Sequence, residues 1–183
     1  NGTAEALNGS VQEALDAGIQ VVTYDSDIAL DGVSAINQDD TALATNGLEG
    51  IAADFDAEAS LVVLSVAGFA PLDNRLAAVD TFVADNPGIE IVTQTGTVSG
   101  SASLDTAAQI SALLKANGPG EIDVIWSHWN EFTKGAFAAL QEAGRDDIAV
   151  YTVDLTDAEL PYFWDETVDF QLASATNPAT IGR

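Results

Sequence analysis

The segment from Trp129 to Asp154, WNEFTKGAFAALQEAGRDDIAVYTVD, contains the pattern that most constrains the fold. Apolar residues in its first half recur every three or four positions, which predicts a helix with one buried face. We expect Asn130 to be its N-cap and Gly144 to end it. The run from Ile148 to Val153 is apolar enough for a strand buried on both faces. The segment therefore predicts a helix and a parallel strand with a polar group at each end.

The same design is repeated along the chain. Near the start, an apolar helical stripe from Leu7 to Leu15 ends at Gly18, and a strand over 19–24 runs into Asp25. We expect further strands at 61–64, 89–93, 124–126 and 170–173, with helices around 72–83 and 107–114. Strands that alternate with helices across short breakers are typical of an α/β protein. The sequence thus predicts a doubly wound parallel sheet.

Two of the predicted strands end in an aspartate, Asp25 and Asp154. Ligands of open α/β sheets bind just beyond the carboxyl ends of the strands, where such side chains lie. A turn or a helix cap explains a single aspartate of this kind more simply. The recurrence at equivalent places makes both residues candidates for ligand binding.

The charge of the chain limits its partners. There are 29 Asp and Glu residues against 5 Lys and Arg among 183, a formal net charge of -24. Such a field repels phosphate backbones, so we expect no nucleic-acid partner. The acids are scattered, which favours a charged folded surface over an acidic tail. A surface so rich in acids and poor in lysine suits a salt-rich habitat or an acid-tolerant extracellular setting.

The sequence does not support several kinds of catalytic, metal or nucleotide site. The chain has no cysteine, which removes disulfides, thiol nucleophiles and thiolate metal sites. A catalytic triad would have only His128 as its base, and at a strand-to-helix junction this histidine is better explained as a structural or rim residue. The acids of DSDIALDG lack calcium-loop spacing, and Gly96 and Gly100 do not form a nucleotide fingerprint. We expect no metal site and no cofactor.

Four segments, taken in order, resemble one protein family: VQEALDAGIQVVTYDSD, AINQDD, WNEFTKGAFAALQEAGRDDIAVYTVD and ASATNPATIGR. Their order and spacing are similar to those of type I periplasmic binding proteins, specifically the sugar-binding subunits of ABC importers such as ribose-binding protein. The resemblance covers nearly the whole chain. It implies two α/β lobes, joined by three crossovers, that close over a ligand held by polar side chains and aromatic faces.

The resemblance also implies roles for individual residues. Asp25 and Asp154 match acids that accept hydrogen bonds from sugar hydroxyls, and Arg75 and Asn130 match residues that donate to the ligand. Thr176 stands where several members have a ligand-binding glutamine, a departure that affects which sugar is bound. The candidate ligand-binding set is Asp25, Asn37, Phe69, Arg75, Trp129, Asn130, Asp154 and Thr176.

Aromatic rings are the second kind of candidate contact, because a sugar offers an apolar ring face that stacks on them. The candidates are Phe69, Trp126, Trp129 and Trp164. Aromatic residues at such spacings are more often part of the core. We therefore expect about one or two of the four to reach the ligand.

On the family layout, residues 1–36 belong to the first lobe, 37–176 to the second, and 177–183 cross back to the first. Members normally carry two further βα units before the first helix and another strand pair at the end, so we expect an incomplete binding protein. The implied function is capture of a sugar or similar small polyhydroxy solute and its delivery to a membrane permease. We expect a monomer without enzymatic activity, in the periplasm or outside the cell, where a lipid anchor at the cell surface is an option.

Two other functions are compatible with the same fold. The effector-binding domain of a LacI-type transcription regulator shares it, although these regulators commonly carry a Val-Pro-x-Asp insertion where this chain has only residues 144–148, GRDDI. A sugar isomerase or hydrolase could use Asp25 and Asp154 as an acid/base pair. Only those two acids support an enzymatic function, and a fold alone does not specify a reaction.

Overall fold

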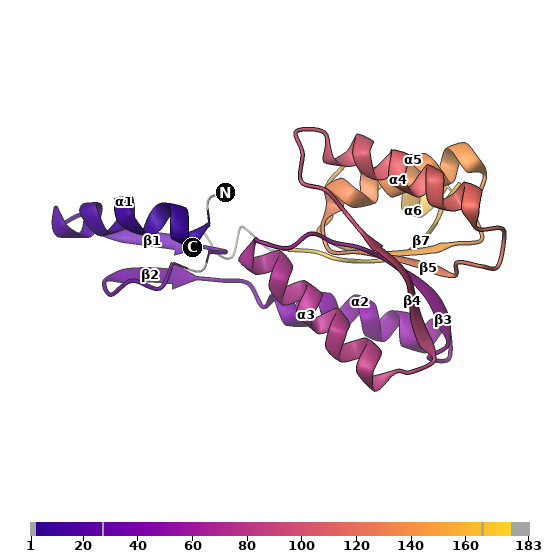
Figure 1. Ribbon diagram of the computed structural model, residues 1–183, viewed down its shortest axis with the longest axis horizontal. Coiled ribbons are helices and arrows are strands. Elements are labelled where there is room, and N and C mark those ends of the chain that lie inside the picture. The colour runs from indigo at the N-terminus through magenta and orange to yellow at the C-terminus, as the bar shows by residue number, and fades with distance from the viewer. Residues whose placement is uncertain (1–2, 27, 166, 177–183) are drawn as a thin grey trace.

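The computed structural model describes residues 3–26, 28–165 and 167–176, which form a small unit and a large unit (Figure 1). The small unit contains α1 (Ala4–Asp16), β1 (Val21–Tyr24) and β2 (Val33–Ile36), and its two strands pair in parallel. The elements of the large unit are α2 (Asp40–Asp54), β3 (Ala59–Leu64), α3 (Ala70–Asp85), β4 (Ile89–Thr95), α4 (Ala102–Ala116), β5 (Val124–Ser127), α5 (Asn130–Ala143), β6 (Ala149–Val153), α6 (Tyr162–Asp165) and β7 (Asp169–Ser174).

The large unit is built on a five-stranded sheet in the order β4-β3-β5-β6-β7, and every pairing in it is parallel. Helices α2 and α3 cover one face, while α4, α5 and α6 lie on the other (Figure 1). This arrangement confirms the predicted doubly wound α/β fold. It also explains why the central strands are almost continuously apolar, since each strand is covered on both faces.

Alternate residues of one strand supply two separate cores. In β3, Val62 and Leu64 pack with α4 and α5, whereas Leu61 and Val63 pack with α2 and α3. All four side chains are fully buried. The sheet is thereby fixed from both sides, which gives the loops at its carboxyl end a rigid base.

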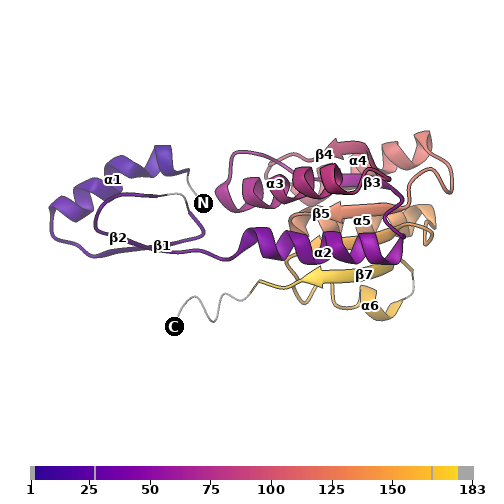
Figure 2. The ribbon, with the colours of Figure 1, turned by 90° about the horizontal axis from the view of Figure 1, so that it is seen from below.

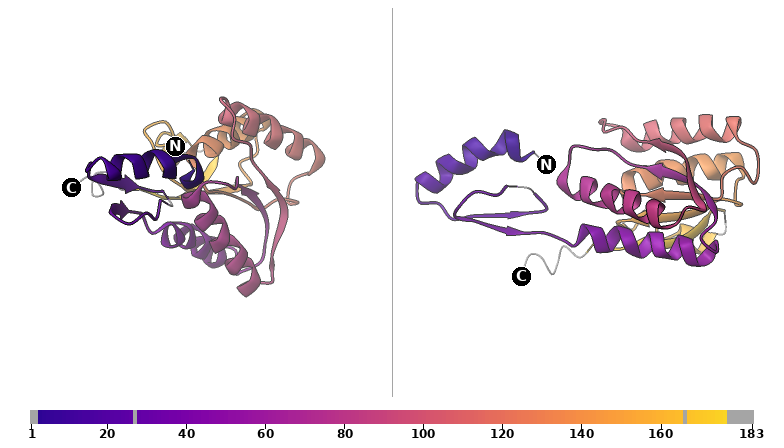
Figure 3. Two further views of the ribbon diagram at one scale, coloured as in Figure 1. Left: turned by 60° about the vertical axis from the view of Figure 1, so that its left-hand side comes forward. Right: turned by 60° about the horizontal axis from the view of Figure 1, so that its bottom comes forward.

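The sequence patterns did not reveal β2, α2 or α6. Helix α2 was missed because Gly47 and Gly50 interrupt its interior. The structure shows a packing reason for both glycines: a Cβ on Gly47 would lie 3.3 Å from Trp126 Nε1, and one on Gly50 would lie 3.2 Å from Tyr151 Cε1. The small residues let α2 lie close to the sheet and beside α3 (Figures 2 and 3).

The expected ends of α5 are partly correct. Gly144 ends the helix in the left-handed conformation, with φ of 64°, as predicted. The prediction for Asn130 is wrong: Trp129 occupies the N-cap position and Asn130 is the first helical residue. This shift of one position turns the Asn130 side chain from a capping group into a group at the sheet edge.

The small unit lies beyond one end of the large unit (Figures 2 and 3). Helix α1 has no buried residue, and Val22 and Tyr24 of β1 are 65% and 63% exposed. None of the helices in the described part of the chain combines the length and apolarity needed to span a bilayer. The crossover expected at 177–183 lies outside the described residues.

Candidate functional site

A cavity of about 630 Å³ lies between the two units. In Figure 1 the arrowheads of β1 and β2 point toward the large unit, and in Figure 2 that of β7 points toward the small unit. Residues that follow strands therefore meet there, as expected for an α/β sheet. The cavity is lined by Tyr24, Asp25, Gln38, Phe69, Pro71, Leu72, Arg75, Val98, Trp129, Asn130, Asp154, Leu155, Thr156 and Thr176.

Asp25 and Asp154 occupy equivalent places in the two units, directly after β1 and β6. Both have left-handed backbones, with φ of 47° and 71°. This region is unfavourable for most residues with a side chain but is tolerated by aspartate and asparagine. Each backbone is held by the neighbouring strand: Asp25 N donates to Ile36 O at 3.1 Å, and Asp154 N donates to Ser174 O at 3.0 Å. The sharp turn ends each strand at a carboxylate that lines the cavity.

The carboxylate of Asp25 is oriented by Gln38. The Gln38 backbone N donates to Oδ1 at 3.0 Å and its Nε2 donates to Oδ2 at 2.8 Å. An ionised carboxylate can accept about four hydrogen bonds. Asp25 can therefore accept further bonds from ligand hydroxyls without giving up these two.

Arg75 lines the cavity but is only 3% exposed. Its Nε donates to Asp40 Oδ1 at 2.9 Å, and its Nη1 donates to the His128 carbonyl at 2.7 Å and to Asp154 Oδ2 at 3.2 Å. One guanidinium thus connects α2, α3, the end of β5 and the end of β6. These contacts make Arg75 a positioning residue for the Asp154 carboxylate.

Burial affects the protonation of two groups beside Arg75. It raises the pKa of Asp40, and the Arg75 charge acts in the opposite direction. Burial and then the Arg75 charge lower the pKa of His128 to about 3, against a backbone hydrogen bond at Leu72 that acts the other way. His128 is neutral at physiological pH, and its Nε2 accepts from Val66 N at 3.0 Å. The expected structural role of His128 is confirmed.

Polar groups from α5 and from the loop after β6 complete this side of the cavity. The side-chain amide of Asn130 has no hydrogen-bond partner among the described residues, so it can donate to a ligand. The backbone N and Oγ1 of Thr156 both donate to Glu159 Oε2 at 2.6 Å. Glu159 is fully buried, and Lys134 Nζ lies 3.8 Å from its Oε1. These contacts fix the loop that carries Asp154 and Thr156.

Of the other candidates, Phe69, Trp129 and Thr176 also line the cavity. Asn37 does not; its Oδ1 accepts from Ser26 N at 3.4 Å, and the adjacent Gln38 faces the cavity instead. Among the aromatic candidates, Trp126 is fully buried in the core and Trp164 is 73% exposed outside the lining. Two of the four rings, Phe69 and Trp129, thus line the cavity, and their contact with a ligand stays a prediction.

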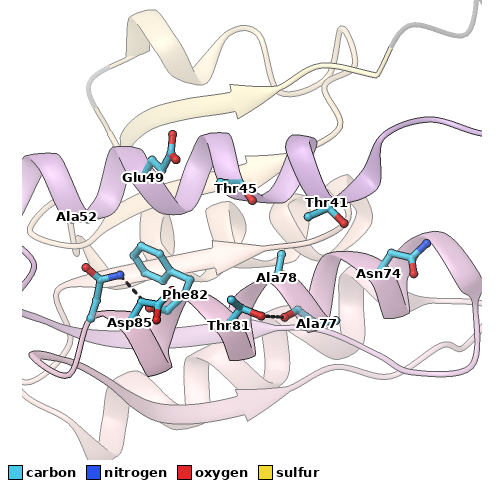
Figure 4. Close-up of a pocket in the computed structure, with 11 residues that line it drawn as sticks. Thr41, Thr45, Glu49, Ala52, Asn74, Ala77, Ala78, Thr81, Phe82 and Asp85 are labelled. Atoms are coloured by element: carbon cyan, nitrogen blue, oxygen red, sulfur yellow. Dashed lines mark hydrogen bonds between the residues drawn. The ribbon is translucent and has the colours of Figure 1, made fainter.

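A second cavity of about 530 Å³ lies in the groove between α2 and α3 (Figure 4). Figure 4 shows threonines, alanines and the acids Glu49 and Asp85 along it. It shares no lining residue with the first cavity. In the described ranges, no group of three or more His, Cys, Asp or Glu side chains is arranged to hold a metal ion.

The family of the chain follows from comparison with known proteins. Residues 1–183 match the family described as periplasmic binding protein domain. The chain belongs to the periplasmic binding protein family. No protein with a curated functional description matches it.

Solved structures of periplasmic binding proteins are similar to this chain. A sugar ABC transporter from Yersinia enterocolitica subsp. enterocolitica 8081 is 34% identical with a TM-score of 0.89, over 94% of this chain and 52% of that one. The 5-methylthioribose transporter solute binding protein from Thermotoga lettingae TMO, in complex with 5-methylthioribose, is 36% identical with a TM-score of 0.82, over 87% and 50%. An ABC transporter solute binding protein from Agrobacterium vitis with bound allitol is 27% identical with a TM-score of 0.84, over 99% and 63%.

The chain therefore spans about half the length of the first two proteins. All three are transport proteins rather than transcription regulators, which favours a transport protein over the LacI-type alternative. Sequence reasoning had found the two aspartates, Asn130, Arg75, Thr176 and two aromatic rings. It missed the remaining lining residues: Tyr24, Gln38, Pro71, Leu72, Val98, Leu155 and Thr156.

Proposed function

We propose that the whole protein is the solute-binding component of an ABC importer and that its ligand is a sugar or similar small polyhydroxy solute. The observation that carries this proposal is the position of Asp25 and Asp154, which face one cavity from the ends of strands in different units. Hydroxyl groups of a polyol donate to carboxylates, and charge-assisted bonds of this kind are strong. The pair provides acceptors on both sides of a bound solute.

The other lining groups suit the same class of ligand. The Asn130 amide can donate to a hydroxyl or ring oxygen, and the faces of Phe69 and Trp129 can pack on the apolar face of a sugar. The cavity volume of about 630 Å³ lies within the usual range for small-molecule sites. The relatives from Thermotoga and Agrobacterium contain 5-methylthioribose and allitol, both small polyhydroxy compounds, which supports this choice.

The same proposal assigns residues 1–36 to one lobe, 37–176 to the other and 177–183 to a crossover between them. The separate sheets of the two units support this division. Ligand binding closes the lobes by a hinge motion, and the closed form docks on a membrane permease. The protein acts as a monomer in the periplasm or outside the cell, and it binds its solute without transforming it.

The test is calorimetric titration of the whole protein with pentoses, hexoses, polyols and nucleosides. Asparagine at position 154 tolerates the left-handed backbone but carries no charge. We therefore expect Asp154→Asn to lower the affinity for the solute about tenfold to a hundredfold. The matched control is Asp80→Asn on the exposed surface of α3, which should leave affinity unchanged.

Two results would overturn the proposal. One is the absence of binding across the whole panel. The other is a ligand whose affinity is unaffected by Asp154→Asn while thermal unfolding shows that the variant is folded. Turnover of a bound sugar would instead favour the enzyme alternative.

A further inference from the structure

The chain crosses from the small unit to the large unit through residues 37–39, which lie between β2 and α2 (Figure 2). Gln38 in this crossover is half-buried and lines the cavity. Asp40, the first residue of α2, follows two positions later. Because two residues span at most about 7 Å, groups held by Gln38 and by Asp40 are kept close to each other by the chain itself.

The crossover is bonded to the end of β1. The backbone N and the Nε2 of Gln38 donate to the Asp25 carboxylate, one to each oxygen, at 3.0 and 2.8 Å. Two parallel bonds of this kind fix the orientation of a carboxylate as well as its position. Ser26 N also donates to Asn37 Oδ1, at 3.4 Å. The Asp25 carboxylate is therefore held by the crossover and not only by its own strand.

The next residues of the chain are anchored on the large unit. Asp39 is the N-cap of α2, and Asp40 is 4% exposed and accepts from Arg75 Nε at 2.9 Å. The Nη1 of Arg75 donates to Asp154 Oδ2 at 3.2 Å. The contacts thus form a continuous path from Asp25 through the crossover and Arg75 to Asp154.

We propose that Gln38 is a positioning residue of the solute site and sets the place of the Asp25 carboxylate relative to that of Asp154. This inference rests on the proposed function, in which both carboxylates accept hydrogen bonds from one solute. Such a solute binds well only when the distance between the two acceptors suits its hydroxyls. Acceptors that are already in place before binding also lower the entropy cost of association. Gln38 therefore affects affinity through Asp25 and not through a contact of its own with the solute.

The test is a double-mutant cycle, with affinity measured by calorimetry on the whole protein. The probe is whichever of D-ribose, L-arabinose, D-glucose, D-galactose and D-mannitol binds the native protein most tightly. Gln38→Met keeps the length of the side chain but removes its donor, and we expect affinity to fall about threefold to tenfold. Asp25→Gly removes the carboxylate and accepts the positive φ of this position. In the Asp25→Gly background, Gln38→Met should change affinity by less than about twofold, because no carboxylate remains to be held.

Two further variants show whether the donor itself matters. Gln38→Lys restores a donor of similar reach, so it should recover most of the affinity that Gln38→Met loses. The matched control is Gln12→Met in α1. Gln12 Nε2 also donates to a carboxylate, Asp16 Oδ1 at 2.8 Å, but the pair is exposed and does not line the cavity. Gln12→Met should leave affinity unchanged, and thermal unfolding checks that each variant is folded.

The outcomes separate this inference from the proposed function. Equal losses from Gln38→Met in the native and Asp25→Gly backgrounds would mean that Gln38 contacts the solute directly. That result, or native affinity in Gln38→Met, would overturn the positioning role and leave the proposed function intact. An equal loss in Gln12→Met would also overturn it, since the effect would not depend on the cavity. Binding of none of the probes, nor of any member of the wider panel, would overturn both proposals.

Discussion

Arg75 and Asp154, which both line the cavity, are joined by a hydrogen bond of 3.2 Å between Nη1 and Oδ2, and the Arg75 side chain is the more deeply buried of the two. The same guanidinium is fixed from the other side by Asp40, at 2.9 Å from Nε. The position of the Asp154 carboxylate therefore depends on contacts made by α2 and α3. One side chain thus connects the buried Asp40 to a carboxylate that lines the cavity.

Replacing Arg75 by methionine should cost about 3–5 kcal/mol of unfolding free energy, because it leaves the buried Asp40 without its partner. Urea denaturation measures this loss. The matched control is Lys115→Met at the exposed end of α4, which removes the same charge and should change stability by less than about 0.5 kcal/mol. Equal losses of stability in the two variants would contradict this prediction, because they would mean that Arg75 affects stability only through the net charge and not through its buried contacts.

His128 gives the protein a defined sensitivity to acid. Its folded-state pKa of about 3 lies below the ordinary value of 6.5, so the unfolded chain binds a proton more readily between these values. The stabilising contribution is fully present above pH 6.5 and is lost as pH falls toward 3, at about 1.4 kcal/mol per pH unit. The variant His128→Gln retains an acceptor for Val66 N but does not titrate.

Because many carboxyl groups also titrate in acid, the informative quantity is the difference in unfolding free energy between the native protein and His128→Gln. As pH falls from 6 to 4.5, the native protein should lose about 1.4 kcal/mol per pH unit more unfolding free energy than His128→Gln does. Urea denaturation at four pH values measures it. Parallel pH profiles would show that His128 is protonated in the folded protein as easily as in the unfolded chain.

The packing of α4 against α5 depends on a glycine. A Cβ on Gly135 would lie 2.3 Å from Ser103 O and 2.7 Å from Thr106 Cβ, so the helices would have to separate. We expect Gly135→Ala to destabilise the protein by about 3 kcal/mol, as measured by urea denaturation. Gly9→Ala in α1 is the control, because nothing lies within 4 Å of the added atom and alanine favours a helix; it should stabilise by about 0.5–1 kcal/mol. A neutral Gly135→Ala would contradict the close approach of the two helices.

The fold could be predicted from the sequence where periodicity was strong. Buried strands such as β6 and amphipathic helices such as α5 carry their own signals in apolar spacing. Helix α2 carries no such signal, because Gly47 and Gly50 interrupt its pattern. Both glycines are needed for close packing on Trp126 and Tyr151, which belong to strands far along the chain. Tertiary packing, rather than local propensity, decided that element.

Part of the candidate site could likewise be predicted from local sequence patterns, and part could not. Asp25 and Asp154 were visible because a polar residue that directly follows an apolar strand is a local pattern. The role of Arg75 was not visible, since its partner Asp40 lies 35 positions away in the helix that the patterns missed. Val98 and Leu72 line the same cavity because β4 and β3 are neighbours in the sheet, and this strand order was not specified by the sequence.

The acidic surface predicts a response to salt. With 29 acidic and 5 basic residues, like charges repel one another across the folded surface. Raising NaCl from about 0.01 M to about 1 M shortens the screening length from about 30 Å to about 3 Å, so most of this repulsion is removed. We expect the melting temperature to rise throughout this range, by about 2–4 °C for each kcal/mol recovered.

Sucrose at matched osmolality separates charge screening from solute exclusion, because it is excluded from protein surfaces but carries no charge. Salt should stabilise the protein more than sucrose does, and most of the rise should occur at the low end of the range, where the screening length changes most in absolute terms. A melting temperature that does not change with NaCl, or that rises equally in sucrose, would contradict a stability limited by surface repulsion. In that case the acids would be spaced widely enough for water alone to screen them, and the excess of acids would serve solubility without a stability cost.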